Sequence, residues 1–141
     1  MKVAIIYDTH TGITGAAAEK MADVVRAAGH ECTAVSAWNA DPATVNRADA
    51  VVVGAWTKGW LVIRQHPSEG ALQLLEKLSL NGKPVAVFAT YKLAVGSTVT
   101  QLARAVEHSG GRVTGMYAVK GPKVPPGFEG WVASLGSGVA I

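Results

Sequence analysis

The segment VAIIYDTHTGIT, residues 3–14, begins with an apolar run and ends in a loop made of threonines and one glycine. The run Val3–Tyr7 has the continuous apolar character of a central strand in a parallel sheet that is covered on both faces. After the loop, apolar residues recur at helical spacing, at Ala18, Met21, Ala22 and Val25. A strand, a short polar loop and a helix in this order predict a β–α unit whose loop lies at the start of the helix.

Four further strand-like runs alternate along the chain with segments of helical period. They are Glu31–Ser36, Ala50–Gly54, Val85–Ala89 and Val113–Val119. Helical spacing recurs in residues 71–78 and 99–106, and a weaker last helix is expected within residues 125–135. Asp41 followed by Pro42 predicts a short helix before the third strand. This alternation predicts an α/β fold with a doubly wound parallel sheet, in which ligands bind at the carboxyl ends of the strands.

The composition fits one domain that spans residues 1–141. Hydrophobic residues make up 49% of the chain and charged residues 16%, against about 25% charged residues in an average protein. The apolar runs are too short to cross a bilayer, nothing resembles a signal peptide, and the single Cys32 cannot form an internal disulfide. No Cys/His set has metal-ligand spacing, and a net charge of +3 without a basic run does not predict nucleic-acid binding. We therefore expect a cytoplasmic domain with no bound metal and no membrane or nucleic-acid partner.

The loop at residues 9–14 has the features of an anion-binding site. A helix N-terminus presents backbone N–H groups without partners and a partial positive charge. Gly12 lets the main chain approach a phosphate closely. Three hydroxyls can donate further hydrogen bonds, those of Thr9, Thr11 and Thr14. Neither G-x-x-x-x-G-K-[ST] nor G-x-G-x-x-G occurs, which argues against a triphosphate or dinucleotide loop. The alternative is that these residues serve only as turn and cap residues.

This loop resembles the T-x-T-G-x-T phosphate signature of the flavodoxin superfamily. The matching residues are Thr9, His10, Thr11, Gly12, Ile13 and Thr14, directly after the first strand. The resemblance in element order covers the chain from residue 2 to about residue 120. It implies a flavodoxin-like five-stranded parallel sheet of order 2-1-3-4-5 with helices on both faces. It also implies FMN as the cofactor, with its phosphate held by main-chain amides and hydroxyls of the matching residues.

In this superfamily two further loops hold the isoalloxazine ring of FMN, often with an aromatic side chain on one or both faces. The segment Gly54–Trp60 is similar to the first of them, G-x-x-T-[aromatic]-G, except that Lys58 stands where an aromatic residue is common. Trp56 and Trp60 flank that position, and Trp60 is slightly favoured as the residue that stacks on the ring. The alternative is that these tryptophans only pack at a strand end, the role assigned to Trp38 and Trp131. Cys32 is expected to be a small core residue.

The second ring loop is expected after the fourth strand, at residues 90–97. Tyr91 is the candidate for the other face of the ring. With both loops counted, the candidate ring contacts are Ala55, Trp56, Thr57, Lys58, Gly59, Trp60, Thr90, Tyr91, Lys92 and Gly96.

The loops at the carboxyl ends of the strands carry a basic excess. They contain the basic residues Lys58, Arg64, Lys92, Lys120 and Lys123 and the acidic residues Asp8, Asp41 and Glu69. Electron-carrier flavodoxins are typically acidic at this edge. A redox partner of this chain is therefore expected to present an acidic surface.

The resemblance implies a carrier, monomeric or weakly dimeric, that passes electrons between a reductase and an acceptor. Such a carrier needs no catalytic group, and no paired carboxylates or Ser/His/Asp set is evident. One alternative is an FMN-dependent oxidoreductase that acts on a small molecule. The protoporphyrinogen-oxidase-like members also tend to carry a basic residue where Lys58 stands, and Arg64 and His66 would suit an acidic substrate. The other alternative is a flavin-free relative that acts as a partner module.

Overall fold

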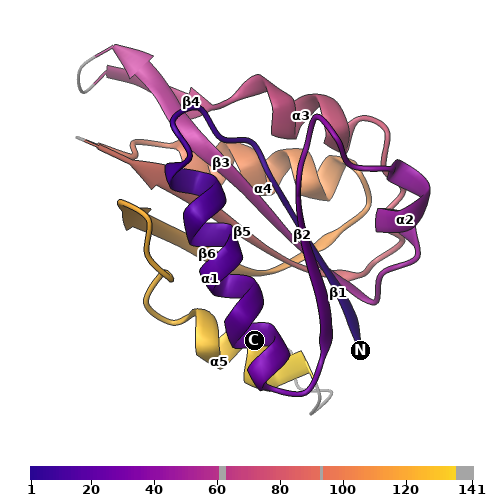
Figure 1. Ribbon diagram of the computed structural model, residues 1–141. Coiled ribbons are helices and arrows are strands. Elements are labelled where there is room, and N and C mark those ends of the chain that lie inside the picture. The colour runs from indigo at the N-terminus through magenta and orange to yellow at the C-terminus, as the bar shows by residue number, and fades with distance from the viewer. Residues whose placement is uncertain (61–62, 93, 136–141) are drawn as a thin grey trace.

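The computed structural model describes residues 1–60, 63–92 and 94–135, and within these the side chains of all residues except 59–66. The elements along the chain are β1 (Lys2–Tyr7), α1 (Ile13–Ala27), β2 (Glu31–Ser36), α2 (Pro42–Asn46), β3 (Ala50–Trp60), β4 (Ile63–Pro67), α3 (Glu69–Leu75), β5 (Pro84–Tyr91), α4 (Thr98–His108), β6 (Arg112–Lys120) and α5 (Phe128–Leu135). Figure 1 shows the strands as one twisted sheet with helices packed around it.

Five strands pair in parallel in the order β2-β1-β3-β5-β6. The predicted doubly wound sheet is therefore confirmed, because the chain winds outward from β1 first in one direction and then in the other. The register places Ile5 of β1 between Ala34 of β2 and Val52 of β3. The loops after β1, β3 and β5 consequently meet at one edge, which we call the carboxyl edge of the sheet.

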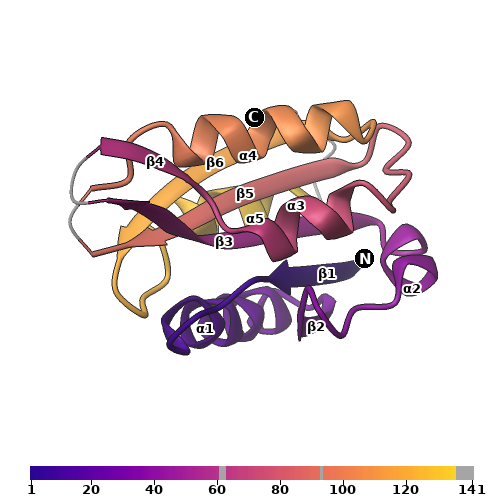
Figure 2. The same cartoon turned by 90° about the horizontal axis from the view of Figure 1, so that it is seen from above.

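Each face of the sheet is covered by its own helices. On one face, α1 and α5 pack Met21 and Trp131 against Val52 of β3. On the other face, Leu75 of α3 and Leu102 of α4 pack against the alternate strand residues, such as Val53. Figure 2 shows the strands running between α1 and α4. The predicted packing roles of Trp131 and Cys32 are confirmed, since they are 1% and 8% exposed.

The third strand is longer than predicted. β3 continues past Gly54 to Trp60, and β4 returns antiparallel to it, with Thr57 opposite Pro67. The prediction that residues 55–60 form a loop is therefore wrong. A strand end that leaves the sheet needs a partner for its backbone groups, and β4 supplies one. The pairing register shifts between Lys58 and Trp60, where the sequence has a glycine that accommodates the irregularity.

The third helix is shorter than its periodicity suggests. α3 ends at Leu75, whereas the helical spacing predicted it to residue 78. Leu78 and Leu80 are nevertheless buried in the same core. None of the helices in the described ranges is long and apolar enough to cross a membrane.

Candidate functional site

The loop between β1 and α1 is folded around the side chain of Thr9. The Thr9 Oγ1 atom accepts hydrogen bonds from the backbone N–H groups of Gly12, at 3.1 Å, and Gly15, at 3.3 Å. Gly12 precedes the first residue of α1 and has φ 87°, in the left-handed region that favours glycine. A Cβ built on Gly12 would meet nothing within 4 Å, so the space above the loop is open.

This open side of the loop carries unpaired backbone donors. The amides of Thr11, Ile13 and Thr14 donate to no protein acceptor within the described ranges, and the first amide bonded to the loop backbone is that of Ala16. Because the positive end of the α1 dipole lies at the same place, the loop is suited to an anion. The residues present therefore fit a phosphate group held by neutral donors.

The three predicted hydroxyls have different surroundings. Thr11 is exposed, and Thr9 can still donate outward while it accepts the two loop amides. Thr14 is 1% exposed, and its hydroxyl lies 2.6 Å from that of Thr90 on β5. Thr14 and Thr90 were both site candidates, and the structure brings them together across α1 and the sheet.

An aromatic stack joins the phosphate loop to β3. The rings of His10 and Trp56 lie 4.8 Å apart between centroids, with an interplanar angle of 24°. The ammonium group of Lys58 lies 5.5 Å from the centre of a Trp56 ring. The structure thus gathers three of the predicted residues, His10 from the phosphate loop and Trp56 and Lys58 from β3, into one cluster beside the anion site.

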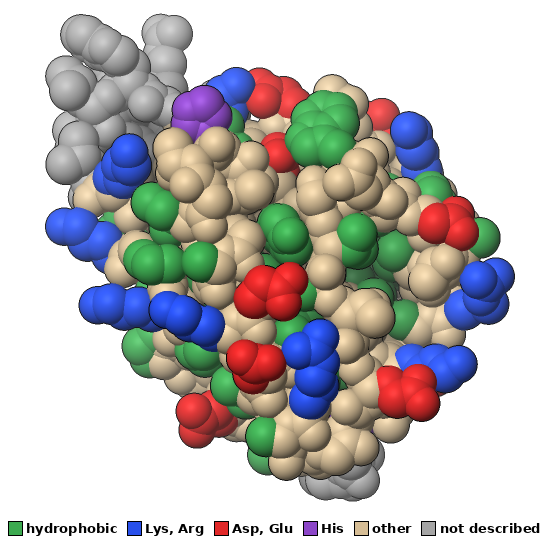
Figure 3. Space-filling view, in the orientation of Figure 1, with side chains coloured by type: hydrophobic (Ala, Val, Ile, Leu, Met, Phe, Trp, Pro, Cys, Tyr) green, Lys and Arg blue, Asp and Glu red, His purple; other side chains and the backbone are tan. Residues whose placement is uncertain are grey.

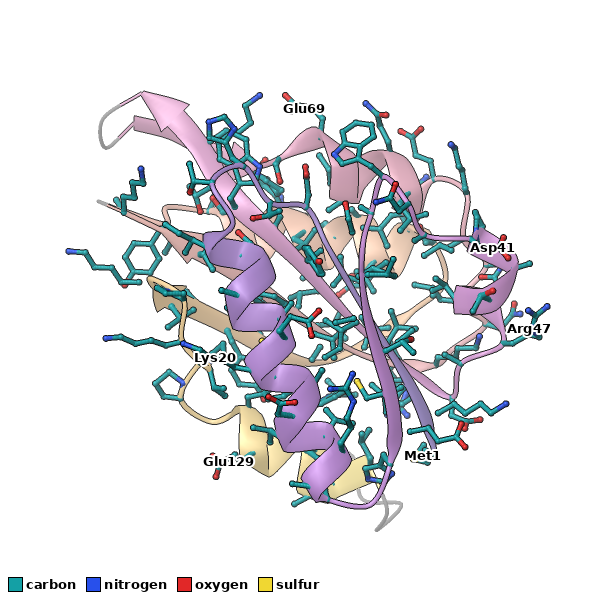
Figure 4. The ribbon with its side chains drawn as sticks, viewed as in Figure 1. Met1, Lys20, Asp41, Arg47, Glu69 and Glu129 are labelled. Atoms are coloured by element: carbon teal, nitrogen blue, oxygen red, sulfur yellow. The ribbon has the colours of Figure 1, made fainter. Side chains whose placement is uncertain are left out.

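The charge of Lys58 is neutralised by Glu69 at the start of α3. Lys58 Nζ lies 2.9 Å from both carboxylate oxygens of Glu69. The sequence analysis places both residues among the charges at the carboxyl ends of the strands but does not predict that they form an ion pair. Figure 4 shows Glu69 at the start of α3. Lys58 is therefore not a free cation at the mouth of the site.

The carboxylate of Asp8 ties three segments together beneath the cluster. Asp8 is 5% exposed; its Oδ1 accepts from Nε1 of Trp38 at 3.0 Å, and its Oδ2 accepts from the N–H of Gly70 at 2.9 Å. The sequence treated Asp8 as a surface charge, and only its place directly after a buried strand hinted at this role. The prediction that Trp38 is a packing residue is wrong, because its side chain is 63% exposed and is held at the surface by the bond to Asp8.

The loop after β5 completes the edge. The strand is longer than predicted and includes Thr90 and Tyr91, so the prediction that these two residues belong to the loop is wrong. Tyr91 is partly buried, Lys92 is exposed, and Gly96 has φ 53°. Among the described residues, the buried Thr57 hydroxyl on β3 has no hydrogen-bond partner, and neither do the hydroxyls of Ser68 and Thr98. The side chains of the predicted residues Trp60, Arg64 and His66 lie outside the described part of the structure.

The site offers groups that bind and orient a ligand. In the described ranges, no group of three His, Cys, Asp or Glu side chains could hold a metal ion. Burial raises the pKa of the Cys32 thiol to about 11, and Cys32 lies near the start of β2, away from the carboxyl edge. The groups at the carboxyl edge are amides, hydroxyls, aromatic rings and surface lysines, together with the carboxylates of Asp8 and Glu69.

Comparison with solved structures shows the same fold in several flavodoxins. The two-electron reduced flavodoxin of Megasphaera elsdenii is 23% identical with a TM-score of 0.76, over 94% of this chain and 98% of that one. A flavodoxin from the domain Archaea is 20% identical with a TM-score of 0.76, over 96% and 94% of the two chains. The Fusobacterium nucleatum flavodoxin bound to flavin mononucleotide is 17% identical with a TM-score of 0.62, over 79% of this chain and 68% of that one.

The sequence comparisons agree with the fold. No curated protein sequence matches the chain. The family model described as flavodoxin matches residues 5–131, which include the phosphate loop, β3, β5 and most of the scaffold around them. The chain is therefore a member of the flavodoxin family.

Proposed function

We propose that this flavodoxin binds FMN and carries electrons between a reductase and an acceptor protein. Membership in the family supports FMN as the cofactor. The single observation that carries the proposal is the start of α1, where unpaired amides surround an open glycine loop directly beside an aromatic cluster. When bound, FMN supplies the reversible uptake of one or two electrons.

The residues of the phosphate loop hold the cofactor in this proposal. The amides of Thr11, Ile13 and Thr14 and the hydroxyls of Thr9 and Thr11 would bind the phosphate. These donors are neutral, so the macrodipole of α1 is the main source of positive potential there. Thr14 supports the loop from below through its bond to Thr90.

The residues at the ends of β3 and β5 would hold the ring. The stack with His10 brings Trp56 next to the phosphate loop, and we therefore favour Trp56 over Trp60 as an aromatic contact on the β3 side. Tyr91 stands at the end of the neighbouring strand and would contact the ring from the β5 side. The other proposed ring contacts are Ala55, Thr57, Lys58, Gly59, Thr90, Lys92 and Gly96.

The pairing of Lys58 with Glu69 bears on the alternative of a small-molecule oxidoreductase. That alternative cited Lys58 as the basic residue shared with protoporphyrinogen-oxidase-like members, with Arg64 and His66 suited to an acidic substrate, and Glu69 neutralises the charge of Lys58. We favour the electron carrier for this reason. We place it in the cytoplasm, in keeping with a single cysteine that cannot form an internal disulfide.

A titration with two flavins tests the proposal. We expect FMN to bind with quenching of flavin fluorescence, and riboflavin, which lacks the phosphate, to bind at least about tenfold more weakly, a difference of about 1.4 kcal/mol. Equal affinity for the two flavins would show that the loop does not hold the phosphate. Failure to bind either flavin would overturn the proposed function.

A further inference from the structure

Four exposed lysines gather where β5 and β6 end. Lys92 follows β5, and Lys120 is the last residue of β6, opposite Tyr91 in the strand register. Lys123 lies in the next loop, and Lys20 on α1 donates from Nζ to the carbonyl of Pro122 at 2.7 Å. We call Lys20, Lys92, Lys120 and Lys123 the lysine rim. Figure 3 shows blue side chains collected along the left side of the molecule, where these strands end, and Figure 4 labels Lys20 on the same side.

No lysine of the rim has an ion-pair partner among the residues that the structure describes. The side-chain ion pairs seen within the described ranges are Arg26 with Asp23 and Lys58 with Glu69, and neither includes a rim lysine. Without the four rim lysines, the nine remaining basic residues of the chain are outnumbered by its ten acidic residues. The lysine rim thus places four of the thirteen basic residues of the chain at one edge of the sheet.

The rim borders the proposed ring site. Lys92 directly follows Tyr91, and Lys120 lies opposite Tyr91 on the neighbouring strand. An attractive potential here would bring a partner to the same side as the ring contacts on β5. Clustering four like charges at one edge of a cofactor site is unfavourable for the protein alone, so a role in association accounts for it better than solubility does.

The presence of lysine rather than arginine in the rim indicates which class of partner it would bind. All four rim residues are lysines, whose flexible point charges suit loose encounters with carboxylates. Recognition of nucleic-acid phosphates favours the bidentate guanidinium of arginine, which the rim lacks. We propose that the lysine rim is the docking surface for a redox protein whose own electron-transfer site is surrounded by acidic residues, an inference that rests on the proposed function.

Two small electron-transfer proteins of opposite charge test this proposal. FMN-loaded protein is reduced with dithionite and mixed in a stopped-flow instrument with plastocyanin, which is acidic, or with mitochondrial cytochrome c, which is basic. The rim variant is K120E/K123E. The control variant is K2E/K77E, which makes the same change in net charge on exposed lysines far from the carboxyl edge. Thermal unfolding verifies that both variants are folded.

We expect the rim variant to reduce plastocyanin about tenfold more slowly than the wild type at about 0.02 M salt, and this difference to shrink at about 0.3 M salt. The control variant should differ from the wild type by less than about twofold, and the rim variant should reduce cytochrome c faster. Equal effects of the two double variants on plastocyanin would overturn the proposal. Rim-dependent binding to phosphatidylserine vesicles or duplex DNA at about 0.15 M salt, tighter than binding to plastocyanin, would also overturn it.

Failure of the proposed function is distinguishable from failure of the docking surface. Calorimetric binding of plastocyanin to the protein without FMN does not require the cofactor. If neither flavin binds but plastocyanin still binds through the rim, the proposed function falls and the docking surface stands. If FMN binds and both double variants bind plastocyanin like the wild type, the docking surface falls and the proposed function stands.

Discussion

The two edges of the sheet are built from the same strands and helices, yet they differ in how they use their backbone groups. At the amino edge the turns bond to one another: the N–H of Gly82 donates to the carbonyl of Gly110 at 2.7 Å, and that of Leu80 donates to Ser109 at 3.0 Å. At the carboxyl edge, amides at the start of α1 and the buried hydroxyls of Ser68 and Thr98 have no partner in the part of the protein that the structure describes.

The difference suggests that the two edges have different roles, with the amino edge contributing to stability and the carboxyl edge to ligand binding. Unpaired buried polar groups cost free energy, and a protein retains them where a ligand compensates for the cost. The amino edge is therefore a closed scaffold, and the carboxyl edge is kept open at the expense of stability. Four experiments test this difference between the edges, and the one with the strongest expected effect comes first.

The first concerns the rigidity of the sheet just below the carboxyl edge. A Cβ on Gly54 would lie 2.2 Å from Cζ of Phe88 in a fully buried site. We expect Gly54→Ala to lower the free energy of unfolding in urea by about 3 kcal/mol through overpacking. Gly130→Ala on α5 is the control, because its Cβ meets nothing within 4 Å, and alanine should raise stability by up to about 1 kcal/mol. Equal stabilities of the two variants would mean that β3 or the Phe88 side chain shifts at little cost in free energy to accommodate the added methyl group.

The second compares two carboxylates that accept backbone N–H groups at opposite edges. Asp8 is buried and accepts two hydrogen bonds, whereas Asp49 is exposed and accepts one, from the N–H of Lys2 at 2.8 Å. We expect Asp8→Asn to cost about 2 kcal/mol of unfolding free energy, because the amide must direct an N–H at a donor, and Asp49→Asn to cost less than about 1 kcal/mol. A larger loss for the Asp49 variant in chemical denaturation would contradict the burial argument.

The third compares the glycines at the two ends of α1. Gly12 has φ 87° and Gly29 has φ 92°, and a Cβ on either would meet nothing within 4 Å. Alanine should therefore cost both positions about 1 kcal/mol of stability through backbone strain. Only Gly12→Ala should also weaken FMN binding, by about tenfold, since its Cβ occupies the open side of the phosphate loop. A Gly29→Ala variant with the same loss of FMN affinity would assign the effect to the helix as a whole.

The fourth concerns the pH dependence at the amino edge. Burial raises the pKa of Cys32 from 9.0 to about 11. The folded protein holds the thiol neutral, so its contribution to stability is fully present below pH 9 and is lost as the pH rises toward 11. Stability should therefore fall more steeply in this window for the wild type than for Cys32→Ser, as followed by urea unfolding at each pH. The native thiol should also react with iodoacetamide much more slowly than the unfolded one.

Local patterns predicted the strands, the helices and a doubly wound parallel sheet, and the resemblance to flavodoxins implied the strand order and the role of the loop at residues 9–14. The apolar strands, the helical spacing and the T-x-T-G-x-T loop each report on contacts between near neighbours in the chain. β4 was missed because its pairing with β3 depends on a return of the chain that no periodicity marks. The bonds of Asp8 to Trp38 and Gly70, and the pairing of Lys58 with Glu69, join side chains whose meeting is decided by tertiary packing.

The sequence was likewise sufficient to identify only part of the lysine rim. Lys92, Lys120 and Lys123 were assigned to the edge from their places after strands. Lys20 was not, because it lies in the middle of a helix, and only the fold brings that side of α1 to the loop after β6.

The hydroxyl bond between Thr14 and Thr90 has a mechanical consequence. Thr14 belongs to the helix that would bind the phosphate, and Thr90 belongs to the strand that leads to Tyr91. The proposed phosphate site and the proposed ring site are therefore joined by a hydrogen bond in the interior. This short hydrogen bond fixes the start of α1 against the end of β5. The proposed cofactor would therefore be bound at its phosphate and at its ring by elements that are linked to each other. This linkage would limit the movement of the protein around the cofactor during each electron transfer.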